Sequence, residues 1–194
     1  MKKKLMTVLA LVLVIAMSVA GTYAYLTSHD SVTNTFTVGN VSITMDETDV
    51  DNSTPGADRD VENAYKLIPG TTYTKDPVIH VAANSEDCYL FVKVENNIAG
   101  AETTEAGKTV AAQLKANGWA LVENQTNIYV YKATVNGGAN GTDVNVFGSF
   151  TVSKDISNKA LADAADGKTI VVTACAVQAE GLTAAQAFEA AKFA

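Results

Sequence analysis

The sequence predicts a mainly β protein, a β-sandwich with a few short helices at its periphery. Three observations lead to this fold class. Short runs that alternate apolar and polar residues recur along most of the chain, and this is the pattern of half-buried strands. Turn-forming Gly, Pro, Asn and Asp residues separate the runs. Helical spacing is confined to short segments and no solenoid repeat is present, so we expect a single domain of packed sheets.

The chain begins with a segment typical of a signal peptide. Three lysines at positions 2–4 are followed by an almost unbroken apolar run over residues 5–20. This run is short for a membrane span, and no charged residues that would stop transfer come after it. Export is therefore expected, with retention of the leader as a membrane anchor as the alternative.

Small residues after the apolar run mark the expected cleavage site. We predict cleavage between Ala24 and Tyr25, with Thr22 and Ala24 as the small residues that the peptidase requires. Cleavage after Ala20 is the second choice. Residues 1–24 are then the signal peptide, and residues 25–194 form one domain.

The chain after the leader is strongly acidic. The leader holds three of the 14 basic residues and none of the 21 acidic ones, which leaves 11 basic side chains and a net charge of −10. A chain of this charge without a basic cluster is a poor ligand for nucleic acid and is repelled by anionic lipid. Nucleic acid is therefore excluded as a partner.

An amphipathic strand is predicted directly after the leader, within a segment of residues 25–45. Val32, Phe36 and Val38 share one face with Asn34 between them, and Ser and Thr residues occupy the other face. The apolar phase shifts near residues 39–40, which indicates a bulge or a tight hairpin. An exported strand must cover its apolar face, either on its own sheet or on a neighbouring molecule.

The middle of the chain alternates loops and strands. Residues 46–62 are acidic and rich in turn formers, and Pro69-Gly70 has the order of a type II turn. Strands are expected over residues 77–83, where Pro77 suits a first or edge position, and over residues 88–97.

The last third adds helices. Helical spacing is found over residues 108–118, at about 158–165, and from a capping box at Thr183 and Gln186 to the end. Strands are expected from residue 119, over residues 127–135, over residues 144–152 after a loop at 136–143, and over residues 169–178.

No catalytic or metal-binding motif is evident. His29 and His80 belong to no paired ligand spacing, and we interpret both as ordinary polar surface residues. No nucleophile or phosphate-loop motif is present. An acidic stretch offers carboxylates for Ca²⁺, but its spacing does not fit an EF-hand and a solvated face is the simpler interpretation; its residues are Asp46, Glu47, Asp49, Asp51, Asp58 and Asp60. We therefore predict no metal and no cofactor.

The two cysteines, Cys88 and Cys175, both lie in expected core strands. Export permits oxidation, so one disulfide bridge between them is expected. Two small buried thiols are the alternative.

Three stretches carry a family resemblance: "AGTYAYLTSHDSVTNTFTVGNVSI", "LIPGTTYTKDPVIHVAANSEDCYLFVKV" and "IVVTACAVQAEGLTAAQAFEA". Together with "GW" at residues 118–119 and "VFGSFTV" at 146–152, they resemble the TasA/camelysin family of Gram-positive exported proteins. The resemblance implies a jelly-roll domain, leader removal by a SipW-type signal peptidase, and assembly into extracellular fibres in which the N-terminal strand of one subunit completes the sheet of the next. It also carries the label of a zinc metalloendopeptidase.

The function expected from these observations is that of a secreted structural subunit of biofilm or cell-surface fibres, without catalytic activity. Its partners are other copies of the chain, the SipW-type peptidase and an accessory fibre protein. Val32, Phe36 and Val38 are the expected donor-strand anchors. An accessory or anchoring protein of such fibres and a camelysin-like secreted metalloendopeptidase are the alternatives.

Overall fold

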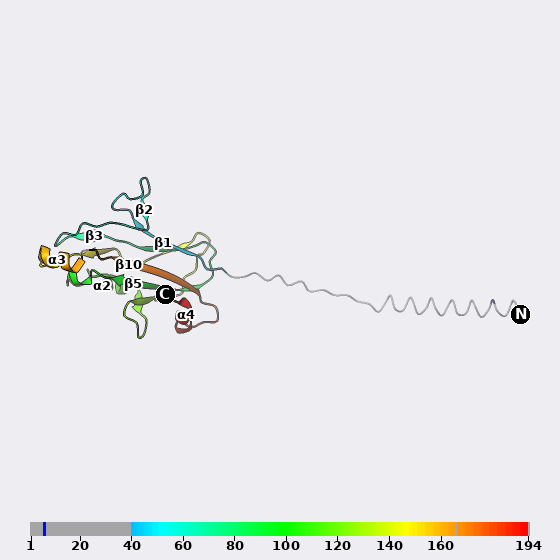
Figure 1. Ribbon diagram of the computed structural model, residues 1–194. Helices are drawn as coiled ribbons and strands as arrows, with labels where there is room; N and C mark the ends of the chain where they lie inside the picture. Colours follow the sequence, from blue (N-terminus) through cyan, green and yellow to red (C-terminus); the bar gives the residue numbers. More distant parts are fainter. Residues whose placement is uncertain (1–5, 7–39, 166, 194) are drawn as a thin grey trace. The chain divides into compact units, whose positions relative to one another are not determined.

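A computed structural model describes residue 6, residues 40–165 and residues 167–193 (Figure 1). The chain divides into two units, residues 1–38 and residues 39–194, and the second is described below. Its strands are β1 (Ile43–Thr48), β2 (Arg59–Asp60), β3 (Thr72–Thr74), β4 (Val78–Val81), β5 (Cys88–Asn96), β6 (Trp119–Leu121), β7 (Ile128–Tyr131), β8 (Thr142–Asn145), β9 (Ser149–Thr151) and β10 (Ile170–Gln178). Its helices are η1 (Ala99–Ala101), α2 (Val110–Ala116), α3 (Asn158–Ala165) and α4 (Ala184–Ala191).

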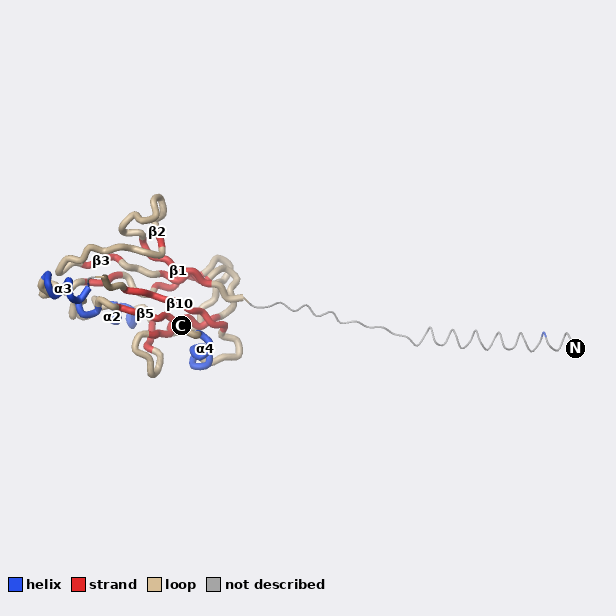
Figure 2. The backbone as a smooth tube through the Cα atoms, viewed as in Figure 1, coloured by secondary structure: helices blue, strands red, loops and turns tan. Residues whose placement is uncertain are grey.

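The mainly β prediction is confirmed, because the strands form several antiparallel sheets. One sheet has the strand order β2-β1-β4-β8, another has the order β10-β5-β7-β6, and β3 pairs with β9. Figure 2 shows the β1 sheet and the β10 sheet in two layers, with α4 beside the second layer on the side away from the first. The jelly-roll arrangement of these strands stays a prediction.

The main core lies between the two layers. From β4, Ile79 and Val81 face it, and from β5, Leu90 and Val92 do so, all of them almost completely buried. The next residue of β5, Phe91, is also buried, but it points to the other face and packs under α4. Both faces of β5 are therefore covered, which explains why this segment has the strongest strand signal in the sequence.

Several local predictions are confirmed at single residues. The Thr71 amide donates to the Ile68 carbonyl at 3.2 Å across Pro69-Gly70, and Gly70 has a φ of +78°, as a type II turn requires. Helix α4 begins at the predicted capping box of Thr183 and Gln186.

Two segments differ from the prediction. Residues 144–152 do not form one strand, because the chain leaves β8 and joins β9 in another sheet, with Val146 and Phe147 both buried at the crossing. Residues 146–148 lie between the two strands, where the chain changes sheets. Residues 43–45 of the expected donor segment lie in β1, where Ile43 pairs with Val81 of the same chain, so that segment can extend only to residues before β1.

Candidate functional site

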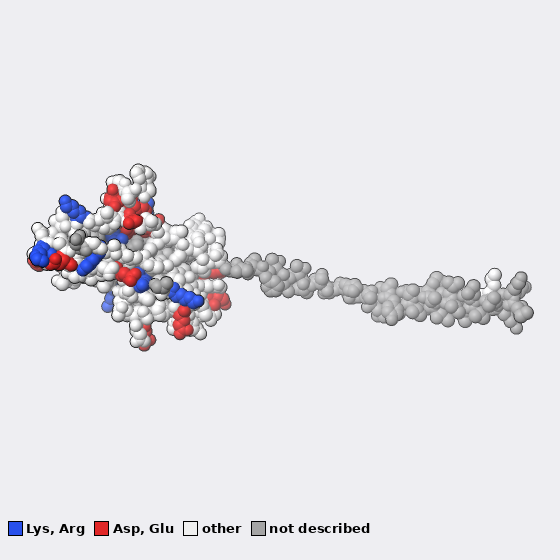
Figure 3. Space-filling view, viewed as in Figure 1, with Lys and Arg blue, Asp and Glu red and all other residues white. Residues whose placement is uncertain are grey.

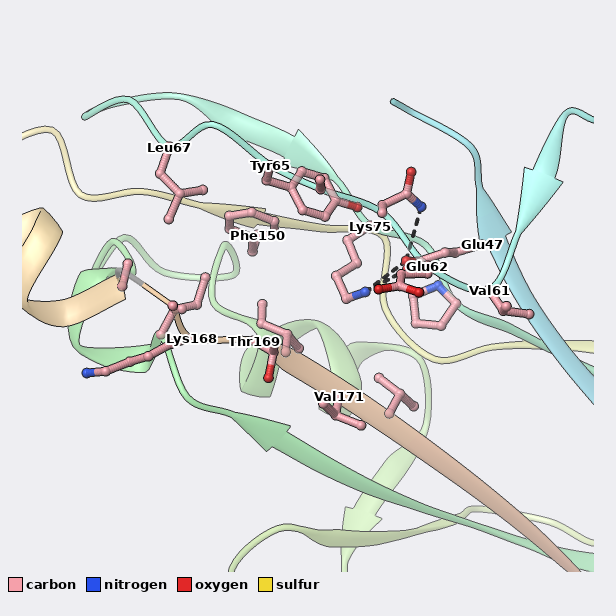
Figure 4. Close-up of a pocket in the computed structure, with 18 of the residues that line it drawn as sticks. Glu47, Val61, Glu62, Tyr65, Leu67, Lys75, Phe150, Lys168, Thr169 and Val171 are labelled. Atoms are coloured by element: carbon pink, nitrogen blue, oxygen red, sulfur yellow. Dashed lines mark hydrogen bonds and ion pairs between the residues drawn. The ribbon is translucent and has the colours of Figure 1, made fainter. Parts of the chain in front are cut away.

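An apolar groove lies between the N-terminal half of β10 and the wall formed by β1 and residues 61–67 (Figure 4). Its volume is about 1050 Å³. Apolar side chains from several elements line it: Met45, Tyr65, Leu67, Phe150, Ile170 and Val172. Val61 and Val171 at its border are 82% and 42% exposed, so apolar surface is open to solvent here.

An aromatic cluster fixes the wall opposite β10. The Tyr65 and Phe150 rings meet edge to face at 5.2 Å, and Tyr73 stacks on Phe150 at 5.1 Å. The Tyr65 hydroxyl donates to the Thr74 carbonyl at 2.9 Å. Burial, assisted by nearby carboxylates, raises the pKa of Tyr65. The phenol therefore stays neutral and keeps this hydrogen bond, which holds the wall in place.

The strand edge beside the groove is open. β10 pairs with β5 along all nine of its residues, and among the described residues no strand pairs with its other edge. The Thr169 carbonyl accepts from Asn97 on the β5 side, so alternation turns the N–H and C=O groups of Ile170 and Val172 toward the open edge. Long unpaired edges invite pairing with another strand, and proteins usually shorten or cover them.

The opposite edge of the same sheet is closed to such pairing. It is formed by β6, which has only three residues. The Trp119 indole of β6 donates to the Asn145 carbonyl at 2.9 Å, and the Asn117 amide just before it donates to the Val146 carbonyl at 3.1 Å. The sheet therefore has one short, anchored edge and one long, open edge.

One buried ion pair lies among the side chains that line the groove. Lys75 Nζ is 3.0 and 2.8 Å from the two carboxylate oxygens of Glu47, and Asn63 Nδ2 donates to Glu47 Oε1 at 3.1 Å. The side chains of Lys75 and Glu47 are only 12% and 6% exposed. Figure 4 shows the Lys75 side chain reaching into the groove toward Glu47.

A second charged network braces β1 behind the groove. Arg59 of β2 pairs with Asp46 of β1 and with Asp76, at 3.1 Å in the second case. Burial acts against the charge on Asp46, but hydrogen bonds from Arg59 and His80 outweigh it, and the pKa of Asp46 is lowered. The strand that forms one groove wall is thus held by charges of opposite sign.

His80 connects this network to β8. Its Nδ1 is 2.7 Å from Asp143 Oδ1, and its Nε2 is 3.1 Å from Asp46 Oδ1. Burial disfavours the charged imidazole, but its close contacts with the carboxylates of Asp46 and Asp143 outweigh burial and raise the pKa of His80. The ring therefore bridges β1, β4 and β8, while its side chain stays 30% exposed.

The acidic loop around β2 is held by hydrogen bonds between its own carboxylates and amides. Figure 3 shows carboxylates gathered over this projecting part of the face in view. Oxygens of Asp49, Asp51 and Asp60 lie within 4.8 Å of one another. Each carboxylate already accepts bonds from the loop: Asp51, for example, accepts from the amides of Ser53 and Ala64 at 2.9 and 2.6 Å. Local hydrogen bonding accounts for the cluster.

The two cysteines are free, so the expected disulfide is absent from this structure. Cys88 pairs with Gln178 and Cys175 pairs with Phe91, three residues along β5, so the two thiols lie on opposite faces of one sheet. Cys88 is in the main core and Cys175 is under α4. Burial raises the pKa of the Cys88 thiol to about 11. The sequence placed both residues in core strands but could not tell their faces apart.

The other predicted site residues lie outside the described residues: the cleavage site Ala24–Tyr25, the donor-strand anchors Val32, Phe36 and Val38, and His29. The groove and its ion pair were not predicted from the sequence. The relevant signal in the sequence was the apolar run at 169–178, which predicted a buried strand rather than a strand at the edge of a sheet.

Comparison with known protein families identifies the family of the chain. The profile of the camelysin metallo-endopeptidase family matches residues 1–146. The chain belongs to this family. No curated protein and no solved structure matches it. Among the described residues, every helix is too short or too polar to cross a bilayer.

The family name implies a catalytic metal, and the described residues do not fit one. A catalytic zinc site needs three protein ligands that converge and leave one position open. The two nitrogens of His80 face two different carboxylates. Among the described residues, the acidic side chains that lie close enough together to hold a metal ion are three aspartates, and these accept hydrogen bonds from the loop's own amides. The described residues therefore do not provide a zinc site that could support catalysis.

Proposed function

We propose that this protein is an exported structural subunit of extracellular fibres and has no catalytic role. In this proposal a SipW-type peptidase removes residues 1–24, and residues 25–38 of one copy add as a strand to the open edge of β10 in the next copy. The observation that supports the proposal is the nine-residue edge of β10, which no described strand pairs with, beside a groove lined by apolar side chains.

The donor segment has the composition that such a groove requires. Residues 25–38 carry one aspartate and one histidine as their only ionisable side chains besides Tyr25, so the donor segment itself adds little charge to this contact. Burial of Val32, Phe36 and Val38 contributes roughly 5–8 kcal/mol before the cost of ordering the strand. Because the donor and the acceptor are different surfaces, the contact repeats into an open filament.

Deletion of residues 25–38 from the mature protein tests the proposal. The expected result is a folded monomer that forms no filaments in negative-stain electron microscopy, since the acceptor groove belongs to residues 40–193. A synthetic peptide of residues 25–38 should also stop elongation of the unmodified protein. Filaments formed by the deleted protein at the usual rate would contradict the proposal.

A strand that serves only its own subunit gives the opposite result. If residues 25–38 fold back onto the open edge of the same molecule, their deletion should lower the melting temperature sharply. Phe36→Asp should have the same effect, because it buries an unpaired charge. In the proposed assembly, Phe36→Asp leaves the monomer stable and prevents polymerisation.

The two alternatives are separated by simple measurements. An accessory or anchoring protein would cap or nucleate fibres of another component and form none by itself. The family description favours the endopeptidase alternative. A purified His29→Ala, His80→Ala double variant addresses it: stoichiometric zinc and proteolysis in the unmodified protein, lost together in the variant, would establish the enzyme.

A further inference from the structure

The ion pair of Lys75 and Glu47 is almost completely buried in the wall of the groove, next to apolar side chains such as Met45 and Tyr65, whereas other polar side chains that line the groove include Glu62 and Lys168. Removing two charges from water costs more than most ion pairs recover, and apolar residues of similar volume are often as stable. Stability alone is therefore a weak reason for Lys75 and Glu47 to be here. A single polar contact within an apolar interface is, however, an effective way to fix register.

The ion pair has unused hydrogen-bonding capacity. A lysine ammonium group has three N–H donors, and among the described residues the acceptors of Lys75 Nζ are the two oxygens of Glu47. At least one donor remains for an occupant of the groove. Each Glu47 oxygen has two lone pairs, and Oε2 receives only the Lys75 contact among the described residues. An occupant that offers one acceptor and one donor would complete both groups.

Within residues 32–38, the part of the segment that holds the three apolar anchors, one residue of this kind lies on the apolar face. Asn34 lies between Val32 and Phe36 in the alternating pattern, and its side-chain amide carries one carbonyl oxygen and one NH₂ group. We propose that Asn34 of an incoming copy binds Lys75 and Glu47 of the acceptor and thereby sets the register of the added strand. This inference rests on the proposed function.

Register errors are penalised by the same contact. A slip of two residues keeps the apolar face directed into the groove but places Val32 or Phe36 against the ion pair, which leaves its spare donor without an acceptor. It also places Asn34 against apolar side chains. The polar Asn34 between apolar anchors and the buried ion pair of the groove therefore favour one register over those two residues away.

A double-mutant cycle in the full-length mature protein tests this contact. Asn34→Val should raise the critical concentration for assembly about tenfold, as expected for the loss of one hydrogen-bonded polar contact. In the background Glu47→Gln, Lys75→Met, the same Asn34→Val change should have no effect or should favour assembly. Thr35→Val, on the opposite strand face, is the matched control, and its effect must be the same in both backgrounds.

A second measurement uses the unmodified acceptor and so does not depend on the folding of the groove variants. Peptides of residues 25–38, one unmodified and one carrying Asn34→Val, are compared as inhibitors of fibre elongation, and the substituted peptide should need about tenfold higher concentration. Equal inhibition by both peptides, or an Asn34→Val effect that is independent of Lys75 and Glu47, would overturn the register contact and leave the donor strand intact. Failure of both peptides to inhibit would overturn the donor strand itself, and the register contact with it.

Discussion

β10 contributes to two apolar surfaces, of which one is covered by a helix and the other is not covered by any described residue. On the outer face of the sheet, Ala187 and Ala191 of α4 are buried against Phe91, and the Phe188 ring lies 5.7 Å from the Phe91 ring. At the edge of the strand, the groove is covered by none of the described residues, and Val171 at its border stays 42% exposed.

The difference lies in what each surface needs. The outer face presents side chains only, because its backbone groups are paired within the sheet, so a short amphipathic helix is a sufficient cover. The open edge of β10 presents unpaired backbone N–H and C=O groups as well as apolar side chains, and only another strand satisfies both. Within the described part of the chain, the C-terminal helix α4 covers one surface and no strand covers the other.

Proline at the open edge gives the largest expected effect. Val172→Pro removes an N–H that alternation directs away from β5, so the fold of the monomer should survive while strand addition, and with it fibre formation, is lost. The measurement is sedimentation of assembled protein together with the melting temperature of the monomer.

The neighbouring position is the matched control. The Val171 N–H faces β5, so Val171→Pro should remove a ladder bond and destabilise the monomer itself by about 1–3 kcal/mol. If Val172→Pro fibres form normally, or if both variants unfold alike, the open edge of β10 is not the site of assembly.

A substitution on the face covered by α4 should lower the stability of the monomer and leave its assembly unchanged. Phe91→Ala removes a ring that is 1% exposed under α4, and the expected loss is about 3–5 kcal/mol of unfolding free energy. Chemical denaturation measures it. Below the denaturation midpoint the variant should still assemble, and a selective loss of fibres with unchanged stability would show that the two surfaces are not independent.

The sequence predicts local elements well because their signals are local. The turn at Pro69-Gly70, the helix at Asn158–Ala165 and the capping box at Thr183 each depend on neighbouring residues. The same patterns do not tell which sheet a strand joins. Residues 144–152 alternate almost continuously, yet β8 and β9 pair with different strands, since β8 pairs with β4 and β9 with β3.

The candidate site was less predictable because it depends on pairing between distant segments. An apolar run such as residues 170–178 looks the same in a central strand and at an open edge. Lys75 and Glu47 are 28 residues apart, and the buried contact between them exists only once β1 and the wall residues have met. Cys88 and Cys175 illustrate the same limit, since the relative register of β5 and β10 decides that they face opposite ways.

Weakening the helix that covers the outer face should have a moderate effect. Thr183 Oγ1 accepts a hydrogen bond from the backbone N–H of Gln186, and Gln186 Oε1 accepts one from the backbone N–H of Thr183. Thr183→Ala should lower the unfolding free energy by about 1 kcal/mol, and Thr183→Ser should restore most of it. Assembly should not change. Thermal denaturation at fixed pH tests this, and an undiminished melting temperature in the alanine variant would mean that α4 contributes little to stability.

The smallest expected effect comes from pH and concerns the groove wall. His80 has a raised pKa because Asp46 of β1 and Asp143 of β8 outweigh its burial, and Arg59 of β2 is the nearby positive charge that shares Asp46. A group with a raised folded-state pKa stabilises the fold fully below its unfolded value of about 6.5, and this contribution is lost as the pH rises through the folded-state pKa. Above that pH, β1 should be held less firmly beside the groove.

His80→Gln isolates this contribution. Between about pH 5 and pH 9 the unmodified protein should lose about 2 °C more in melting temperature than the variant, a small figure because the ion pairs are partly exposed. Asp46 and Asp76 have lowered pKa values and act in the opposite sense, since their contribution is lost only as the pH falls through their folded-state values in acid. The interval above pH 5 therefore reports His80 separately. Parallel curves for the two proteins would show that the imidazole does not brace the groove wall, whereas divergence toward alkaline pH would show that His80 stabilises the strands that form it.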